Sequence, residues 1–400
     1  MGATSFAHRG TRIRPRVWCR GVAPTVASAD GPCGGGGGGR FCCGTDRLSP
    51  RARRHRWRYP DHAHSHFVLS RARGKRDRWA ARQFPAEEWD PTPMSPASRA
   101  VLVIDVGTSG LRSALVGTDG GLVDYHHIDQ PPSTPSPGYV EFDADALYRA
   151  AVEAATTVVR KHPEVVVDAL GITNQRASVV AWDARNGDPV GPGIGWQDLR
   201  TVIECITVKT EYGVAIAPNQ TATKAAWLLA NNASELPRDA LRFGTIDAWL
   251  TWKLSGGDAF ITDHTNAAVT GLVDVTTIDW DASVCAIFGI PVECLPRVVP
   301  SRNVVGHVVG HPDLDGIALA ARIGDQQASL VGQGCITPGR TKITFGTGGM
   351  LDMYTGVTGP TEAKRTGFGT FPIVTFSLES DALDIHWGTE AVMLSAGSNI

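Results

Sequence analysis

The sequence predicts an α/β fold built from two related halves, and three observations support this prediction. From residue 100 onward, apolar patterns follow one another as three strands, a helix, a strand and then helices. Tight turns join the first strands, so the sheet is expected to begin antiparallel. After Gly339 the opening order of strand, small-residue turn and strand recurs, which indicates a second domain related to the first.

Individual elements follow from the spacing of apolar residues. Short apolar runs bounded by turn residues predict strands, and apolar residues that return every three or four positions predict helices. Asp143 is placed to cap the first helix, whose apolar face consists of Leu147, Ala151, Ala154 and Val158. Strands are expected over residues 101–104, 111–116, 122–128, 165–172, 179–182, 317–323, 342–344 and 351–354, and further helices over 224–229 and 246–254.

Charge divides the chain near residue 90. Up to that residue there are 18 Lys and Arg against 7 Asp and Glu, whereas the remainder has 20 against 33. The first segment also contains six consecutive glycines and four of the eight cysteines, without zinc-ligand spacing. We therefore expect an Arg- and Gly-rich head without a packed core over residues 1–99. A first domain over 100–334 and the start of a second domain over 335–400 follow it.

The origin of the head has several interpretations. An Arg-rich, acid-poor segment is typical of a transit peptide or of a tail that binds nucleic acid, yet Lys75 is its only lysine. Met94-Ser95-Pro96 stands just before the first expected strand. We favour a true start at Met94, with the head as upstream sequence read as protein. A disordered or targeting tail and a folded segment remain the alternatives.

The most informative motif is Asp105-Val106-Gly107-Thr108-Ser109-Gly110, at the end of the first expected strand. It indicates a β-hairpin in which small residues let backbone N–H groups converge on an anion. Asp105 would hold Mg²⁺ on the phosphates of a nucleotide beside that turn. The alternative is a hairpin turn without a ligand. Phe345-Gly346-Thr347-Gly348-Gly349 repeats the pattern and predicts a second phosphate-binding turn, with the same alternative.

Polar residues also stand at the ends of other predicted strands. Asp325 follows the strand over 317–323, where ligands bind in open α/β sheets, and would accept a proton from a substrate hydroxyl while Gln326 bonds a neighbouring hydroxyl. The alternative for Asp325 is a cap on the helix of residues 326–331. Arg176 ends the polar run Thr173-Asn174-Gln175-Arg176, which suits a polyol, and Trp196 would pack against the carbon face of a sugar. A satisfied loop and a core tryptophan are the alternatives for these two.

The order of these motifs resembles that of the FGGY carbohydrate kinases, over about residues 100 to 400. The matching segments are Asp-x-Gly-Thr-Ser, Ile-Thr-Asn-Gln-Arg, Trp-Gln-Asp, Gly-Asp-Gln-Gln and Gly-Thr-Gly. The resemblance implies the actin-like ATPase fold of two ribonuclease-H-like domains, with the second domain truncated at Ile400. It also implies phosphorylation of a primary hydroxyl of glycerol or a related polyol by ATP and Mg²⁺.

The same resemblance implies roles for individual residues. Asp325 matches the catalytic base, Arg176 and Gln326 match polyol-binding positions, and Asp105 is expected to hold the metal. We also expect Trp196 to contact the substrate, because an indole ring can pack against the carbon face of a sugar. The nucleotide-binding positions implied are Thr108, Ser109, Gly110, Arg112, Gly346, Thr347 and, in the second domain, Gly397.

Two departures put glycerol itself in question. Ala177 stands where the glycerol-phosphorylating members of the family have a substrate-binding glutamate, and Asn219 stands where they have a tyrosine. A kinase of another polyol or a pentulose, and a non-catalytic nucleotide-binding relative, are therefore the alternatives. The natural acceptor stays open.

The remaining expectations concern partners and the end of the chain. We expect a small-molecule partner, no nucleic acid, no membrane and a cytoplasmic location, with a homo-oligomer left open. Because the chain stops at Ile400, where a new helix should begin, we expect residues 94–400 alone to turn over little polyol.

Overall fold

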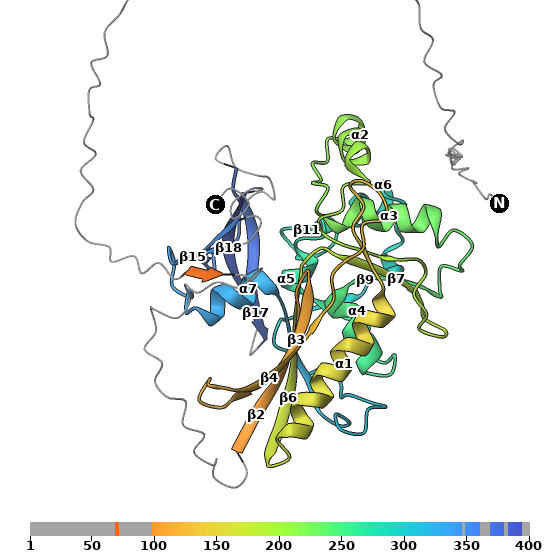
Figure 1. Ribbon diagram of the computed structural model, residues 1–400. Coiled ribbons are helices and arrows are strands. Elements are labelled where there is room, and N and C mark those ends of the chain that lie inside the picture. Colours follow the sequence, from red (N-terminus) through yellow and green to blue (C-terminus); the bar gives the residue numbers. More distant parts are fainter. Residues whose placement is uncertain (1–68, 72–97, 346–348, 361–368, 380–382, 394–400) are drawn as a thin grey trace, which may run out of the picture. The chain divides into compact units, whose positions relative to one another are not determined.

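The computed structural model describes residues 69–71, 98–345, 349–360, 369–379 and 383–393 (Figure 1). All of them belong to one compact unit, Ala63–Ile400. The predicted positions Gly346, Thr347 and Gly397 lie outside the described residues, so their roles stay predictions. No helix among the described residues is long and apolar enough to cross a membrane.

The first sheet has five strands in the order β14-β6-β2-β3-β4. Strand β2 pairs antiparallel with β3, and β3 pairs antiparallel with β4, which confirms the predicted antiparallel start. On the other side of β2, strands β6 and β14 run parallel to it. The strands are β2 (Ser98–Val106), β3 (Gly110–Gly117), β4 (Leu122–Asp129), β6 (Val165–Asn174) and β14 (Ala318–Gly324).

Helix α1 (Ala144–Lys161) lies along this sheet (Figure 1). The Asp143 carboxylate accepts a hydrogen bond from the Ala146 amide at 2.9 Å, so the predicted cap is confirmed. The apolar face predicted for this helix is buried, and it packs with the central strands in the largest core cluster. Local sequence signals and burial therefore agree in this part of the chain.

A second layer is a four-stranded sheet in the order β5-β8-β7-β9, with its own apolar core. Its strands are β5 (Glu141–Phe142), β8 (Gly193–Ile194), β7 (Val179–Asp183) and β9 (Leu241–Thr245). Helices α2 (Val202–Tyr212), α3 (Thr221–Asn231) and α4 (Ile246–Leu254) accompany it. The sequence predicted α3, α4 and β7 but missed α2 and β9.

Short elements connect α4 to β14, and they include a pair of parallel strands, β10 and β13. Helix α7 (Asp325–Gly332) then follows β14 directly. The four cysteines from Cys205 onward are buried free thiols. The connecting elements are β10 (Ile261–Asp263), α5 (His264–Ala267), β11 (Val273–Asp274), β12 (Asp279–Trp280), α6 (Ala282–Ile287), a 3₁₀ turn (Val292–Cys294) and β13 (Arg297–Val299).

A second five-stranded sheet has the order β1-β15-β16-β18-β17. Strands β15 and β16 form the predicted antiparallel hairpin. Beyond this hairpin the strand order differs from that of the first sheet, because β18 rather than β17 pairs with β16. The head contributes β1, which pairs in parallel with β15 and was not predicted. The strands are β1 (Leu69–Arg71), β15 (Thr341–Phe345), β16 (Gly349–Gly356), β17 (Phe371–Glu379) and β18 (Leu383–Met393).

Candidate active site

The carboxyl ends of three parallel strands meet at one edge of the first sheet. Asp105 on β2 lies opposite Thr173 on β6, and Thr173 lies opposite Ile323 on β14. The residues that follow in each strand therefore emerge together at this edge. This register brings Asp105, the run ending in Arg176, and Asp325 to the part of an open sheet where ligands bind.

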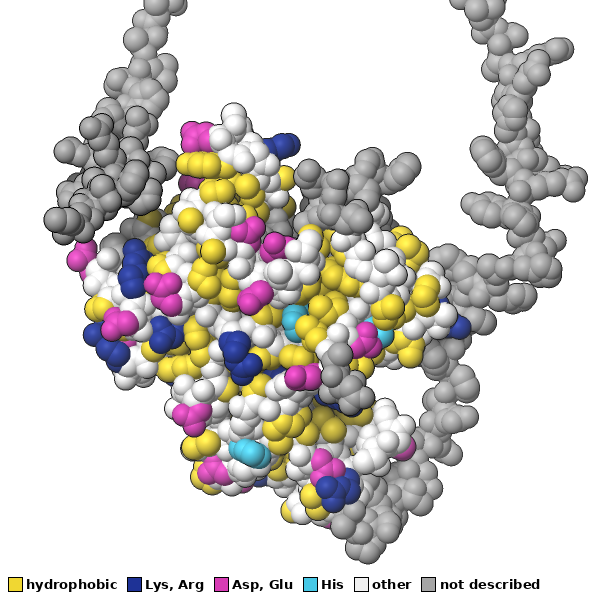
Figure 2. All heavy atoms as spheres, turned by 180° about the vertical axis from the view of Figure 1, so that it is seen from behind, with side chains coloured by type: hydrophobic (Ala, Val, Ile, Leu, Met, Phe, Trp, Pro, Cys, Tyr) yellow, Lys and Arg dark blue, Asp and Glu magenta, His cyan; other side chains and the backbone are white. Residues whose placement is uncertain are grey.

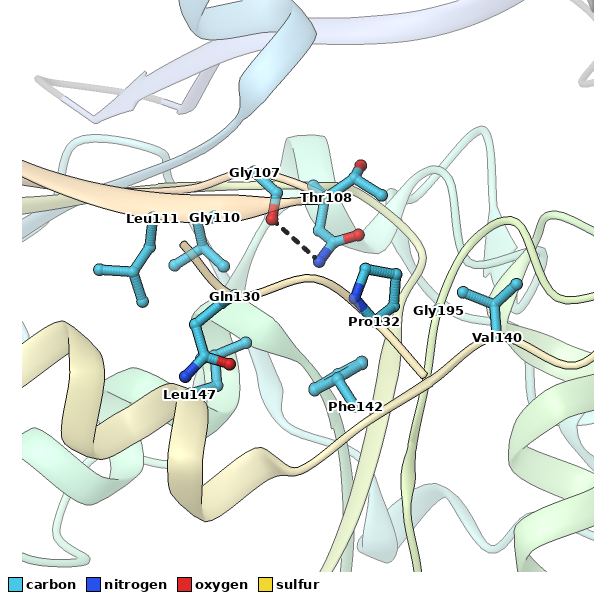
Figure 3. Close-up of a pocket in the computed structure, with 12 residues that line it drawn as sticks. Gly107, Thr108, Gly110, Leu111, Gln130, Pro132, Val140, Phe142, Leu147 and Gly195 are labelled. Atoms are coloured by element: carbon cyan, nitrogen blue, oxygen red, sulfur yellow. Dashed lines mark hydrogen bonds between the residues drawn. The ribbon is translucent and has the colours of Figure 1, made fainter. Parts of the chain in front are cut away.

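The turn between β2 and β3 is closed by a hydrogen bond of 2.9 Å from the Gly107 amide to the Gly110 carbonyl. The Gln175 side-chain amide donates to the Gly107 carbonyl at 3.3 Å, which ties the turn to the end of β6 (Figure 3). A Cβ at Gly110 would lie 2.8 Å from both the Ile128 carbonyl and the His127 ring, so a side chain does not fit there. Beneath the turn lie Leu111, Phe142 and Leu147 (Figure 3).

Asp105 and Arg112 face each other across this hairpin. The Arg112 Nε lies 3.1 Å from the Asp105 Oδ2, and the two side chains are 57% and 30% exposed respectively. Burial raises the pKa of Asp105, and Arg112 and His127 oppose the rise. The predicted phosphate contact Arg112 is therefore also the ion-pair partner of the predicted metal ligand.

Asp325 is the first residue of α7, and its Oδ1 accepts the amide of Gln326 at 2.8 Å. The helix cap is Gly324, so the interpretation of Asp325 as a capping residue is wrong. Burial raises the pKa of Asp325; Arg176 opposes the rise and Asp105 adds to it. Because the charge of Asp105 helps to raise the pKa of Asp325, the two carboxylates interact electrostatically.

Donor chemistry at this edge fits a hard cation. Mg²⁺ binds through one or two carboxylates together with substrate phosphates, and it keeps several waters. Asp105 beside the Gly107–Gly110 turn offers one such carboxylate, with Asp325 near it. No group of three or more His, Cys, Asp or Glu suited to a metal exists among the described residues.

Arg176 lies between two acidic groups. Its Nε is 3.7 Å from the Asp325 Oδ1, and one terminal nitrogen is 2.7 Å from the Glu390 Oε2 on β18. The same nitrogen lies 3.7 Å from the sulfur of Met350. A Cβ at Gly324 would lie 2.7 Å from the Arg176 side chain, so only glycine fits at this position beside the arginine.

Gln326 and Trp196 are both held by specific hydrogen bonds. The Gln326 Oε1 accepts from Lys342 Nζ at 2.8 Å and from Thr344 Oγ1 at 3.1 Å, so a ligand meets its NH₂ group. The Trp196 indole donates to Thr108 Oγ1 at 3.1 Å. Trp196 thereby connects the predicted phosphate turn to the predicted acceptor side.

These side chains line one cavity of about 940 Å³. Thr108, Arg176, Trp196, Asp325 and Gln326 all contribute to its wall, which brings together five of the predicted site residues. Ser109, Gly110, Arg112 and Asp105 stand at the hairpin beside it. Most of the remaining wall is apolar and includes Ala177, Ile216, Val273, Val275, Ile278 and Trp387.

Ala177 and Asn219, the two departures, both line this cavity. Ala177 has a φ of 61°, in the left-handed region, and its carbonyl accepts the Thr221 hydroxyl at 3.1 Å. The Asn219 carbonyl accepts from Lys224 Nζ at 3.2 Å, and the same nitrogen donates to the Gly195 carbonyl at 3.3 Å. Lys224 thus holds the two loops that carry Asn219 and Trp196.

Sequence reasoning missed three buried charges near the site: Lys342, Asp352 and Glu390. Lys342 and Asp352 interrupt the apolar strands β15 and β16, which was a signal that they pair. The sequence around Glu390 did not predict its contact with Arg176, because the two residues come from different sheets.

Comparison with known proteins identifies the family to which the chain belongs. The model of the N-terminal domain of the FGGY family of carbohydrate kinases matches residues 100–332. A glycerol kinase of Janthinobacterium sp. (strain Marseille) is 38% identical over 275 residues, which cover 65% of this chain and 54% of that protein. A glycerol kinase of Gloeobacter violaceus is 34% identical over 316 residues, or 76% and 61% of the two chains. The chain thus spans little more than half the length of these relatives.

Solved structures agree on the fold. The crystal structure of Plasmodium falciparum glycerol kinase with ADP superposes with a TM-score of 0.71 at 25% identity, over 76% of this chain and 63% of that one. A xylulose kinase from Rhodospirillum rubrum gives a TM-score of 0.66 at 19% identity, over 75% and 62%, and supports the fold alone. The α/β, actin-like ATPase fold expected from the motif order is confirmed.

Proposed function

The chain belongs to the FGGY family of carbohydrate kinases, and we propose that it transfers the γ-phosphoryl group of ATP to a primary hydroxyl of glycerol or a related polyol. One observation carries the proposal. A partly buried carboxylate, Asp325, shares a cavity with the hydrogen-bonding side chains of Arg176 and Gln326 and with Thr108 of the phosphate turn.

The acceptor side follows from these groups. Arg176 and the NH₂ group of Gln326 donate hydrogen bonds to hydroxyl oxygens, and Trp196 covers a carbon face. Asp325 accepts the proton of the attacking hydroxyl while its oxygen forms a bond to the γ-phosphorus. The bond from that phosphorus to the β–γ bridging oxygen breaks, and ADP leaves. Burial raises the pKa of Asp325, and this makes the carboxylate a better proton acceptor than an exposed aspartate.

The phosphate side consists of the hairpin between β2 and β3. Backbone N–H groups and hydroxyls of residues 108–110 bind phosphate oxygens, and Arg112 contributes its charge. Asp105 would hold the Mg²⁺, which when bound neutralises the charge of the phosphates. Gly346, Thr347 and Gly397 stay proposed contacts from their motifs.

A second candidate is a kinase of a larger polyol or a ketose. The apolar wall around Ile216, Val275 and Ile278 and the small side chain of Ala177 favour it, because they supply no carboxylate to fix a three-carbon polyol. Basic and acidic side chains are scattered among one another on the face in Figure 2. Among the described residues on that face, no extended patch of basic side chains is seen.

The test is acceptor-dependent ADP formation by the full-length protein. Glycerol, pentitols and ketoses are compared at equal concentration with Mg-ATP, and Asp325→Asn serves as the control variant. We expect at least one alcohol to raise ADP formation well above the rate without acceptor. Tight binding of Mg-ATP with no stimulation by any alcohol would overturn the proposal in favour of a non-catalytic nucleotide-binding protein.

A further inference from the structure

Three buried charged residues form a row across the second five-stranded sheet. Lys342 on β15 lies opposite Asp352 on β16, and Asp352 lies opposite Glu390 on β18. Lys342 and Asp352 are fully buried, and their Nζ and Oδ2 are 2.8 Å apart. Glu390 is 2% exposed. Two carboxyl groups therefore lie side by side on neighbouring strands, away from water.

Arg176 joins this row to the active site. It approaches Glu390 from the first sheet, and its guanidinium reaches Asp325 on the other side. Both Arg176 and Glu390 line the cavity. The position of the Arg176 side chain in the cavity therefore depends on whether Glu390 is ionised or neutral.

The charges of this cluster do not balance. Two cations, Arg176 and Lys342, face three acids, Asp325, Asp352 and Glu390, and like charges on opposed strands destabilise each other. Both oxygens of Asp352 and the Oε2 of Glu390 lack a well-directed hydrogen bond among the described residues. A single proton on the Asp352–Glu390 pair would supply a donor and remove the excess negative charge. Burial raises the pKa of Glu390 to about 8, with Arg176 opposing the rise and Asp352 adding to it.

We propose that Glu390 is a positioning residue for Arg176, and that Glu390 and Asp352 hold one proton between them while the acceptor binds. With the proton in place, Arg176 contacts a neutral partner and remains available to Asp325 and the acceptor. When the proton is lost, ionised Glu390 attracts Arg176 more strongly and withdraws it from the acceptor. The part of this inference that concerns the acceptor rests on the proposed kinase function.

The first experiment compares three variants by steady-state kinetics. Glu390→Ala should raise the acceptor KM by about tenfold, on the scale of one charged hydrogen bond, with little change in kcat. Glu390→Gln, which keeps the shape and a neutral partner, should keep the wild-type KM at pH 6.5. The wild-type KM should rise as pH passes about 8, and Glu390→Gln should abolish that rise. Glu379→Gln, at the exposed last residue of β17, is the matched control.

The second experiment needs no activity. Infrared titration of the wild-type protein should show the C=O stretch of a protonated carboxylic acid at pH 7, and the band should disappear near pH 8. Glu390→Gln should lack it, and Asp352→Asn should lose it at lower pH because the neighbouring charge is gone. Absence of the band in the wild type overturns the shared proton, whereas an unchanged KM and pH profile in Glu390→Ala and Glu390→Gln overturns the positioning role.

These two readouts separate the inference from the proposed function. If no alcohol is phosphorylated, the kinase proposal fails, and the infrared titration still decides whether the pair holds a proton. If Glu390→Ala does not fold, the pH profile and the infrared band of Glu390→Gln decide in its place.

Discussion

The β2–β3 and β15–β16 hairpins each place an acid directly opposite a base, with different consequences. In the β2–β3 hairpin, Asp105 and Arg112 lie next to the turn, and their side chains are 30% and 57% exposed. In the β15–β16 hairpin, Lys342 and Asp352 are both fully buried. Breaking the more exposed pair costs little free energy, so its side chains can bind a ligand instead. Breaking a buried pair leaves a charge without solvation. The same cross-strand arrangement thus serves binding in one place and structure in the other.

The largest expected effect is on turnover, at the residue that lies between the two hairpins. Asp325→Asn should lower kcat of the full-length protein by about 10²–10⁴, the usual contribution of a general base. The affinity for Mg-ADP, measured by calorimetry, should change little. An equal loss of nucleotide affinity would show that Asp325 serves the metal or the fold instead.

Breaking the buried pair should have the largest effect on stability. Lys342→Met leaves Asp352 without its cation and should lower the free energy of unfolding by about 3–5 kcal/mol in urea titrations. The double variant Lys342→Met, Asp352→Leu removes both charges and should recover most of that loss. If the single variant costs less than about 1 kcal/mol, the buried pair does not have the structural role that we assign to it.

Breaking the exposed pair should hardly affect stability. Arg112→Ala should change the free energy of unfolding by less than about 1 kcal/mol but should weaken Mg-ADP binding by roughly tenfold, as for one charged hydrogen bond to phosphate. Arg99→Ala is the matched control, because Arg99 forms a comparably exposed ion pair with Asp168 at the far end of β2. Equal nucleotide affinities of the two variants would contradict a phosphate role for Arg112.

The pH dependence of stability should reflect a further buried base, Lys224. Burial lowers its pKa to about 7, and the charge of Asp198 opposes the fall. The ammonium donates hydrogen bonds to two backbone carbonyls. The unfolded chain binds the proton up to about pH 10.4, so wild-type stability should rise between pH 7 and 10. In Lys224→Met this contribution to the rise should be absent. Parallel pH dependences of unfolding for the two proteins would show that Lys224 stays charged.

The sequence predicted the parts of the site that depend on local patterns. The β2–β3 turn, the capped helix α1 and the placement of Asp325 after β14 each follow from a few consecutive residues. Helix α2 was missed because its β-branched residues give a weak helical pattern, although Gly213 ends it in the left-handed conformation.

The buried charge row illustrates what a single sequence does not contain. Lys342 and Asp352 were visible as charges inside apolar strands, but their pairing depends on the register of β15 and β16. The contact between Arg176 and Glu390 joins residues 214 positions apart in sequence, and it exists only once both sheets have formed. Such long-range contacts follow from tertiary packing rather than from local propensity.

Transfer of label from γ-³²P-ATP to a polyol tests the central claim most directly. The full-length protein is incubated with Mg-ATP and each acceptor, and the labelled products are separated. We predict an acid-stable phosphate ester on a primary hydroxyl, formed only when the acceptor is present and reduced by about 10²–10⁴ in Asp325→Asn. Label that appears solely as inorganic phosphate, at the same rate with and without acceptor, would contradict the assignment of this cavity as a polyol phosphorylation site.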